Sequence, residues 1–225
     1  MDTITDQESV RNQWQDVCFK CSVESTLCER WWSVLEANYS EERRHYHTLH
    51  HIRKMNEAVS SVASNLKRPD LVYWSVFFHD IIYDPKSSKN EEESAKVFEE
   101  FAAECLPEAP TCDITDVSNW ILMTRSHITH IHLTPNKFAN EDKYYFLDAD
   151  MEVLGWANPE YDEYANQIRS EYTHVAEKTF RERRSKVLKS FLKLPNIYAT
   201  KIFRDKYEAQ ARSNLQREID RLGES

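Results

Sequence analysis

Apolar residues recur along most of this chain with the three- to four-residue spacing of amphipathic helices. One run, Leu71 to Phe78, is apolar at nearly every position, which is typical of a buried helix or strand. Helix N-caps are expected at Ser40, Asn90 and Asn158. The pattern predicts helices at about 7–37 (one or two helices), 42–63, 69–80, 90–105, 113–127, 144–155, 158–178, 181–192 and 206–222, with loops at 84–89 and 128–141.

Composition makes an all-α fold the expected class. Only 2 of 225 residues are glycine, which argues against glycine-rich phosphate loops, tight β-hairpins and doubly wound nucleotide folds. The length and the absence of a recognisable linker suit a single domain. Cys18 and Cys21 form a CxxC without a second pair, so the five cysteines are interpreted as reduced thiols of an intracellular protein.

Charge and hydropathy narrow the expected partners. The net charge of −9 disfavours binding to a nucleic-acid polymer. No apolar run approaches the length of a transmembrane helix and no signal peptide is recognisable, so a cytoplasmic protein without a membrane partner is expected.

The residues after the apolar run carry the first candidate chemistry. His79 and Asp80 place an imidazole and a carboxylate at the end of a buried element, and both groups are good ligands for a divalent metal. Asp84 adds a second carboxylate if the turn stays helical. The competing interpretation is a hydrogen-bonded core histidine beside a helix cap.

Four of the nine histidines lie between residues 45 and 51. On a helix, His47 and His51 share one face, which can offer one imidazole to a metal and another to a substrate. His45 and His50 lie on other faces and are expected in solvent.

Further candidates follow along the chain. Glu91 is expected in the first turn of its helix, either near a metal-bound water or as a partner of the helix dipole. His127 and His130 complement a helix C-terminus, line a pocket or add metal ligands, and the last role would suit a di-iron site. Asp148 and Asp150 interrupt an apolar run, and buried carboxylates need a cation, a cap or a metal.

The order of these motifs resembles the HD-domain superfamily of metal-dependent phosphohydrolases. Residues 46–52 also look like the Tyr-His-(x3)-His-Ala segment of cyclic-nucleotide phosphodiesterases. The fuller pattern, over about residues 39–215, is similar to a small family of predicted metal-dependent HD-superfamily phosphohydrolases. Its matching pieces are Arg44-His45-Tyr46-His47, Phe78-His79-Asp80, Asn90-Glu91 with Ser94-Ala95, Leu147-Asp148-Ala149-Asp150 with Leu154-Gly155, Ile168-Arg169 with Glu171-Tyr172, and Glu208 with Ala211-Arg212 and Asn214-Leu215.

The resemblance implies an HD-domain-like helical bundle over residues 1–225, with an N-terminal extension (about 1–38), a metal-site core (about 39–155) and C-terminal helices (about 158–222). The implied metal ligands are His51, His79, Asp80 and Asp150, with Asp148 and Asp84 as alternates. The implied catalytic residues are His47, Asp80 and Glu91, and His47 and His51 exchange roles if His47 aligns with the first histidine of the superfamily. The implied substrate contacts are Arg44, His127, His130, Arg169 and Arg212.

The implied activity is hydrolysis of a small phosphorylated metabolite or nucleotide, whether phosphomonoester, phosphodiester or pyrophosphate, by attack of metal-bound hydroxide. Mixed nitrogen and oxygen ligands suit Mn, Fe, Ni, Co or Zn, with Mg also open. Two alternatives are a di-iron HD-type oxygenase and a non-catalytic ligand-binding HD module. Substrate, number of metals and oligomeric state, including a homodimer, stay open.

Overall fold

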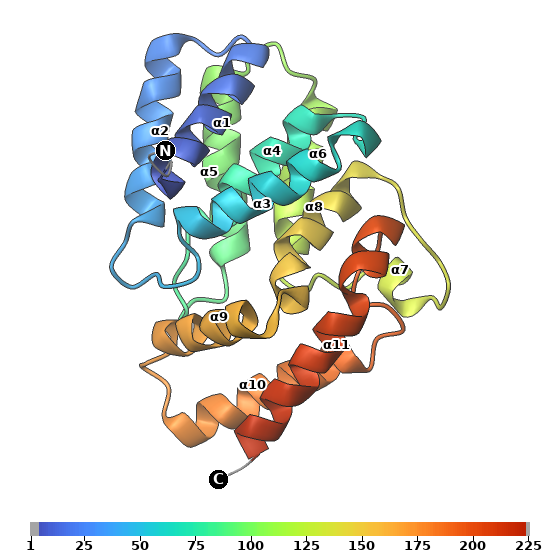
Figure 1. The fold of residues 1–225 in the computed structure, drawn as a ribbon. Helices are drawn as coiled ribbons and strands as arrows, with labels where there is room; N and C mark the ends of the chain where they lie inside the picture. The colour runs from blue at the N-terminus through green and yellow to red at the C-terminus, as the bar shows by residue number, and fades with distance from the viewer. Residues whose placement is uncertain (1–4, 224–225) are drawn as a thin grey trace. The chain divides into compact units, whose positions relative to one another are not determined.

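The computed structural model describes residues 5–223 (Figure 1). Within that range the chain forms eleven α-helices and two short 3₁₀ helices, and the isolated bridge between Ala139 and Thr200 is the only β-type pairing. The predicted all-α fold class is therefore confirmed. None of the described helices is both long and apolar enough to cross a membrane.

The chain divides into two compact units, Met1–His127 and Ile128–Ser225. The boundary falls inside the segment 39–155 that the sequence assigned to a metal-site core, and the single HD-type domain stays a prediction. The first unit contains α1 (Asp6–Lys20), α2 (Ser25–Tyr39), α3 (Leu49–Ser61), η1 (Ala63–Asn65), α4 (Pro69–Phe78), α5 (Asn90–Cys105) and α6 (Thr111–Met123).

Helix α4 is the central element of the first unit. It packs against α1, α3, α5 and α6, and every residue from Leu71 to Phe78 is buried. A helix that is covered on all sides must be apolar on all sides, which explains why this segment lacks the amphipathic pattern of its neighbours. Its one polar side chain in this run, Ser75, donates its hydroxyl to the Leu71 carbonyl at 2.9 Å.

Aromatic rings fix the position of α4 in the core. Trp14 of α1 packs edge-on against Trp74, with ring centroids 5.5 Å apart, and Phe101 of α5 lies 5.0 Å from Phe78. Such pairs contribute about 0.5–1.5 kcal/mol each beyond the burial of their area. This packing fixes the position of the C-terminal end of α4 and of the residues that follow it.

The second unit is held by carboxylates that bind backbone amides. Its elements are α7 (His130–Leu133), α8 (Asp142–Asp150), η2 (Met151–Gly155), α9 (Asn158–Glu171), α10 (Glu177–Leu192) and α11 (Lys201–Gly223). Glu208 accepts from the amides of Ile197 and Tyr198, and Asp148 accepts from those of Ala199 and Thr200. Four consecutive amides of an irregular segment are satisfied in this way.

Several expected boundaries are wrong. The expected helix at 144–155 changes to a 3₁₀ helix after Asp150, the helix expected to reach 178 ends at Glu171, and the last helix begins at Lys201. The N-cap positions of α5 and α9 are Lys89 and Ala157, not the asparagines that follow them. Helix α3 is capped by Thr48, whereas Ser40 ends α2. N-caps are predicted from local sequence, but the same side chains can form hydrogen bonds with loops instead.

Gly155 tests the packing of η2 on α11. A Cβ at this position would lie 2.5 Å from Tyr207 Cβ and 3.0 Å from the Tyr198 hydroxyl. Gly155→Ala is therefore expected to lower the free energy of unfolding by about 1–3 kcal/mol, because the helix must shift to admit the methyl group. Gly223→Ala is the matched control, since no described atom lies within 4 Å of its Cβ position. Urea denaturation would measure both variants, and equal stabilities would contradict the close approach.

Candidate metal centre

Two buried histidines meet inside the first unit. His51 lies in the first turn of α3, and His79 follows directly on α4. Their Nε2 atoms are 3.2 Å apart, and the residues are 2% and 1% exposed. Both side chains are held by helices whose apolar faces are buried, so the pair is positioned by the core itself.

The tautomer of the neutral His79 ring follows from the partner of Nδ1. Nδ1 lies 2.9 Å from the backbone oxygen of Val76. A carbonyl oxygen only accepts, so Nδ1 carries the proton and donates it. In the neutral ring Nε2 then has a lone pair directed toward His51. A backbone carbonyl that fixes the tautomer in this way is the usual outer partner of a metal-binding imidazole.

Asp80 adds a carboxylate to the same place. Its Oδ2 lies 3.1 Å from His79 Nε2 and 3.9 Å from His47 Nε2. A carboxylate oxygen facing the lone pair of a neutral imidazole is repelled unless a proton or a cation lies between them. Imidazole nitrogens and carboxylate oxygens are donor types that divalent transition metals accept.

Asp150 is the partly buried last residue of α8 in the second unit. His51, His79 and Asp150 are a group that could hold a metal ion. The alternate, Asp148, is already engaged by Ala199 N at 2.8 Å, Thr200 N at 2.7 Å and Thr200 Oγ1 at 2.6 Å. Burial nevertheless raises the pKa of Asp148 to about 7. Its carboxylate therefore serves to hold the segment before α11.

His47 does not share a helix face with His51, and this expectation is corrected. Helix α3 begins at Leu49, so His47 lies before its cap. The two rings are nevertheless close, with centroids 6.1 Å apart. His47 stacks on Tyr83 with a centroid distance of 4.0 Å and an interplanar angle of 27°. The stack holds a ring that keeps 17% of its side-chain surface exposed.

The other two histidines of this segment lie outside the pair. His45 is exposed, as the sequence predicted. His50, on α3, is only partly exposed, because its Nδ1 lies 3.0 Å from Asp6 Oδ2 on α1.

The loop after Asp80 is braced by polar contacts. Asn90 Oδ1 accepts from the Asp84 amide at 3.1 Å, and its Nδ2 donates to the Asp84 carbonyl at 2.9 Å. The Asp84 carboxylate accepts from the Lys86 amide at 2.9 Å, so it stabilises its own turn. Glu91 is paired with Arg125, whose nitrogens lie 3.3 Å away. The asparagine expected as a cap is thus part of this brace.

The remaining predicted contacts lie in turns and at helix ends. Arg169 donates to the carbonyls of Tyr172 and Val175. Arg212 donates to the carbonyls of Leu192, Leu194 and Pro195. His127 is partly buried near the end of the first unit, with a positive φ of 56°, and His130 is exposed at the start of α7.

Sequence reasoning missed the ring contacts of the site. Tyr46 lies 5.0 Å from the His47 ring and 4.8 Å from the His51 ring, and Tyr83 stacks on His47. The only signal in the sequence is the position of these tyrosines beside the histidine motifs.

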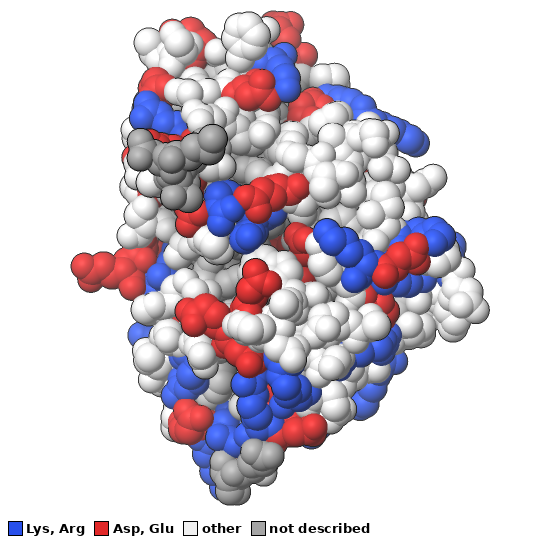
Figure 2. Space-filling view, viewed as in Figure 1, with Lys and Arg blue, Asp and Glu red and all other residues white. Residues whose placement is uncertain are grey.

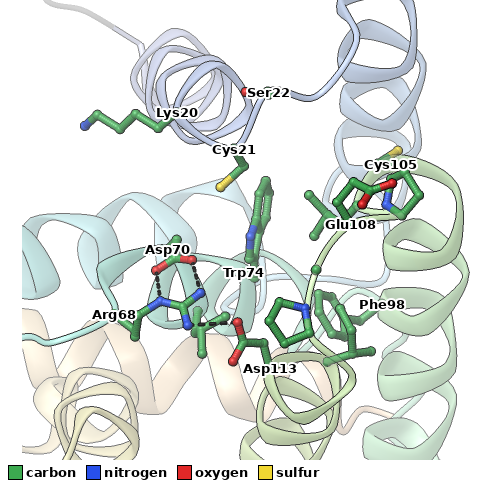
Figure 3. Close-up of a pocket in the computed structure, with 16 residues that line it drawn as sticks. Lys20, Cys21, Ser22, Arg68, Asp70, Trp74, Phe98, Cys105, Glu108 and Asp113 are labelled. Atoms are coloured by element: carbon green, nitrogen blue, oxygen red, sulfur yellow. Dashed lines mark hydrogen bonds and ion pairs between the residues drawn. The ribbon is translucent and has the colours of Figure 1, made fainter.

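A separate cavity of about 400 Å³ opens elsewhere in the first unit (Figure 3). Apolar side chains such as Trp74 and Phe98 line it, and Arg68 lies at its edge between Asp70 and Asp113, with donor–acceptor distances of 2.7–3.0 Å. None of its described lining residues is a predicted site residue, so it is not an extension of the histidine cluster.

Comparisons with family models, curated proteins and solved structures found no match to this chain. The likeness to HD-domain proteins therefore depends on the sequence motifs alone.

The donor set predicts selective binding of a transition metal. His79→Ala removes the imidazole whose tautomer is fixed by the Val76 carbonyl, and with it the Nε2 ligand atom. The variant should bind Co²⁺ at least about 100-fold more weakly in titration calorimetry. His50→Ala is the matched control, because it removes the neighbouring imidazole, which contacts Asp6. Circular dichroism would verify folding, and equal Co²⁺ affinity in both variants would contradict the site.

Proposed function

We propose that this protein is a metal-dependent phosphohydrolase of the HD-domain type, acting on a small phosphorylated metabolite or nucleotide. The observation that carries the proposal is the approach of His51 Nε2 and Asp80 Oδ2 to His79 Nε2, at 3.2 and 3.1 Å, within the first unit. The motif order in the sequence supports the same class. A cytoplasmic location and the absence of nucleic-acid or membrane partners stay predictions.

The donor set suits phosphate chemistry. A divalent metal bound here would polarise a phosphoryl oxygen and lower the pKa of a water ligand to about 7. His51 and His79 would hold it through Nε2, and Asp150 is the proposed further ligand. Asp80 would supply an additional carboxylate oxygen beside His79 and orient the attacking water.

His47 is the proposed proton donor to the leaving oxygen. Its Nε2 is 3.9 Å from Asp80 Oδ2, so it lies at the edge of the donor set. It is partly exposed, and a substrate can reach it. Stacking on Tyr83 limits the rotation of the imidazole, whose Nε2 lies on the side of Asp80. Glu91, the other predicted proton carrier, is instead held by Arg125 in an ion pair.

Phosphate release from a substrate panel tests the proposal. The protein, loaded in turn with Mn²⁺, Co²⁺, Ni²⁺, Zn²⁺, Fe²⁺ and Mg²⁺, would be assayed on p-nitrophenyl phosphate, bis-p-nitrophenyl phosphate, nucleoside monophosphates and pyrophosphate. Metal-dependent hydrolysis of at least one substrate is expected. His79→Ala and Asp80→Ala should reduce it to background with the helical circular dichroism retained, whereas His47→Ala should lower kcat by about 100-fold or more.

The controls separate the competing functions. His50→Ala should keep full activity. Two irons per chain together with oxygen consumption would replace the hydrolase by the di-iron oxygenase. Activity that survives both His79→Ala and Asp80→Ala would contradict the proposed centre. Binding of phosphate esters without turnover under any metal would indicate the non-catalytic binding module.

A further inference from the structure

Arg44 is buried at the junction of the two segments that carry the histidine and aspartate motifs. Its side chain is 0% exposed. Nη1 donates to the carbonyl of Asp80 at 2.6 Å and of His47 at 3.2 Å, and Nη2 donates to the carbonyl of Ile81 at 2.8 Å. One guanidinium therefore binds the backbone on both sides of the candidate metal centre.

The positive charge of Arg44 is compensated by the carboxylate of Glu41. Glu41 Oε2 accepts from Nε at 3.1 Å. The guanidinium carbon also lies 5.0 Å from the ring centre of Tyr39 and 5.7 Å from that of Tyr83, the ring on which His47 stacks. A buried cation needs this kind of partner set, because an uncompensated one would cost several kcal/mol.

The segments that Arg44 joins lie at the ends of two helices that pack on each other: residues 44–48 precede α3 and residues 79–82 follow α4. Their relative position decides where His47 and Asp80 lie with respect to each other. A guanidinium presents donors in a rigid planar fork, whereas the ammonium of lysine is a single point.

We infer that Arg44 is a positioning residue of the metal centre, in place of the substrate contact that the sequence predicted. Its four hydrogen bonds go to Glu41 and to three carbonyl groups of the protein. By tying the His47 and Asp80 carbonyls to one rigid group, Arg44 sets the spacing of their side chains before any ligand binds. The inference rests on the proposed metal centre.

Co²⁺ binding to two variants tests this role. Arg44→Lys keeps a buried positive charge beside Glu41 but loses the fork, and Arg44→Met loses both. Co²⁺ affinity, corrected for the folded fraction, should fall about tenfold in the first and up to about 100-fold in the second, as for other outer partners of metal ligands. The visible absorption spectrum of bound Co²⁺ should change with the coordination geometry.

Arg43→Met is the matched control. Arg43 also pairs with Glu41, at 2.8 Å, but 48% of its side chain is exposed. Its Co²⁺ affinity and spectrum should equal those of the wild type. If Arg44→Met does not fold, Arg44→Lys decides the question. Unchanged affinity and spectrum in Arg44→Lys would overturn the role of Arg44 alone, whereas a wild-type protein that binds no Co²⁺ would overturn the metal centre and this inference with it.

Discussion

Helix α4 ends inside the core of the first unit, where its last four residues are all buried and their carbonyl groups need donors. The accounting is complete: the Ser75 carbonyl accepts from the His79 amide, Val76 from His79 Nδ1, Phe77 from the Tyr39 hydroxyl and Phe78 from the Ile81 amide. One of these donors is the histidine ring. The rule that buried carbonyls must be satisfied therefore also decides the tautomer of His79, and with it the availability of Nε2 for a metal.

The same constraint continues past the helix. The carbonyls of Asp80 and Ile81 accept from Arg44, and that of Ile82 accepts from Ser94 at 3.3 Å. The carbonyls of residues 80, 81 and 82 thus each meet a side-chain donor. The hydrogen bonds that satisfy these buried carbonyls also hold the side chains of the loop in place. The same contacts therefore contribute to the stability of the loop and to the geometry of the site.

The sequence was sufficient for the features that depend on periodicity and composition. The apolar run before His79 predicted a buried helix, and the glycine shortage predicted an all-α fold. The sequence did not reveal where hydrogen bonds go between distant segments. Asn90 has the features of an N-cap but bonds to Asp84, and Arg44 precedes a histidine but bonds to Asp80, 36 positions away. The local sequence does not show which partner is used, because a polar side chain can bind either a nearby or a distant backbone group.

Arginine side chains satisfy backbone carbonyls at several helix ends of this glycine-poor protein. Helices commonly end on a glycine in the left-handed region, which lets backbone amides return to the last carbonyls. Here the described left-handed residues are Ser22, His127 and Asn136, and none is glycine.

Arginine side chains supply donors at other helix ends. Arg169 donates to carbonyls after α9, Arg212 to carbonyls at and after the end of α10, and Arg181 to those of Arg221 and Leu222. Figure 2 shows blue Lys and Arg atoms interspersed with red Asp and Glu atoms in the lower part of the view, where Figure 1 draws α10 and α11. Because a guanidinium has five donors and no acceptor, it suits a cluster of carbonyls as well as it suits a phosphate. An arginine beside a predicted phosphate site can therefore bind either the phosphate or backbone carbonyls. Its hydrogen-bond partners in the structure distinguish these two roles.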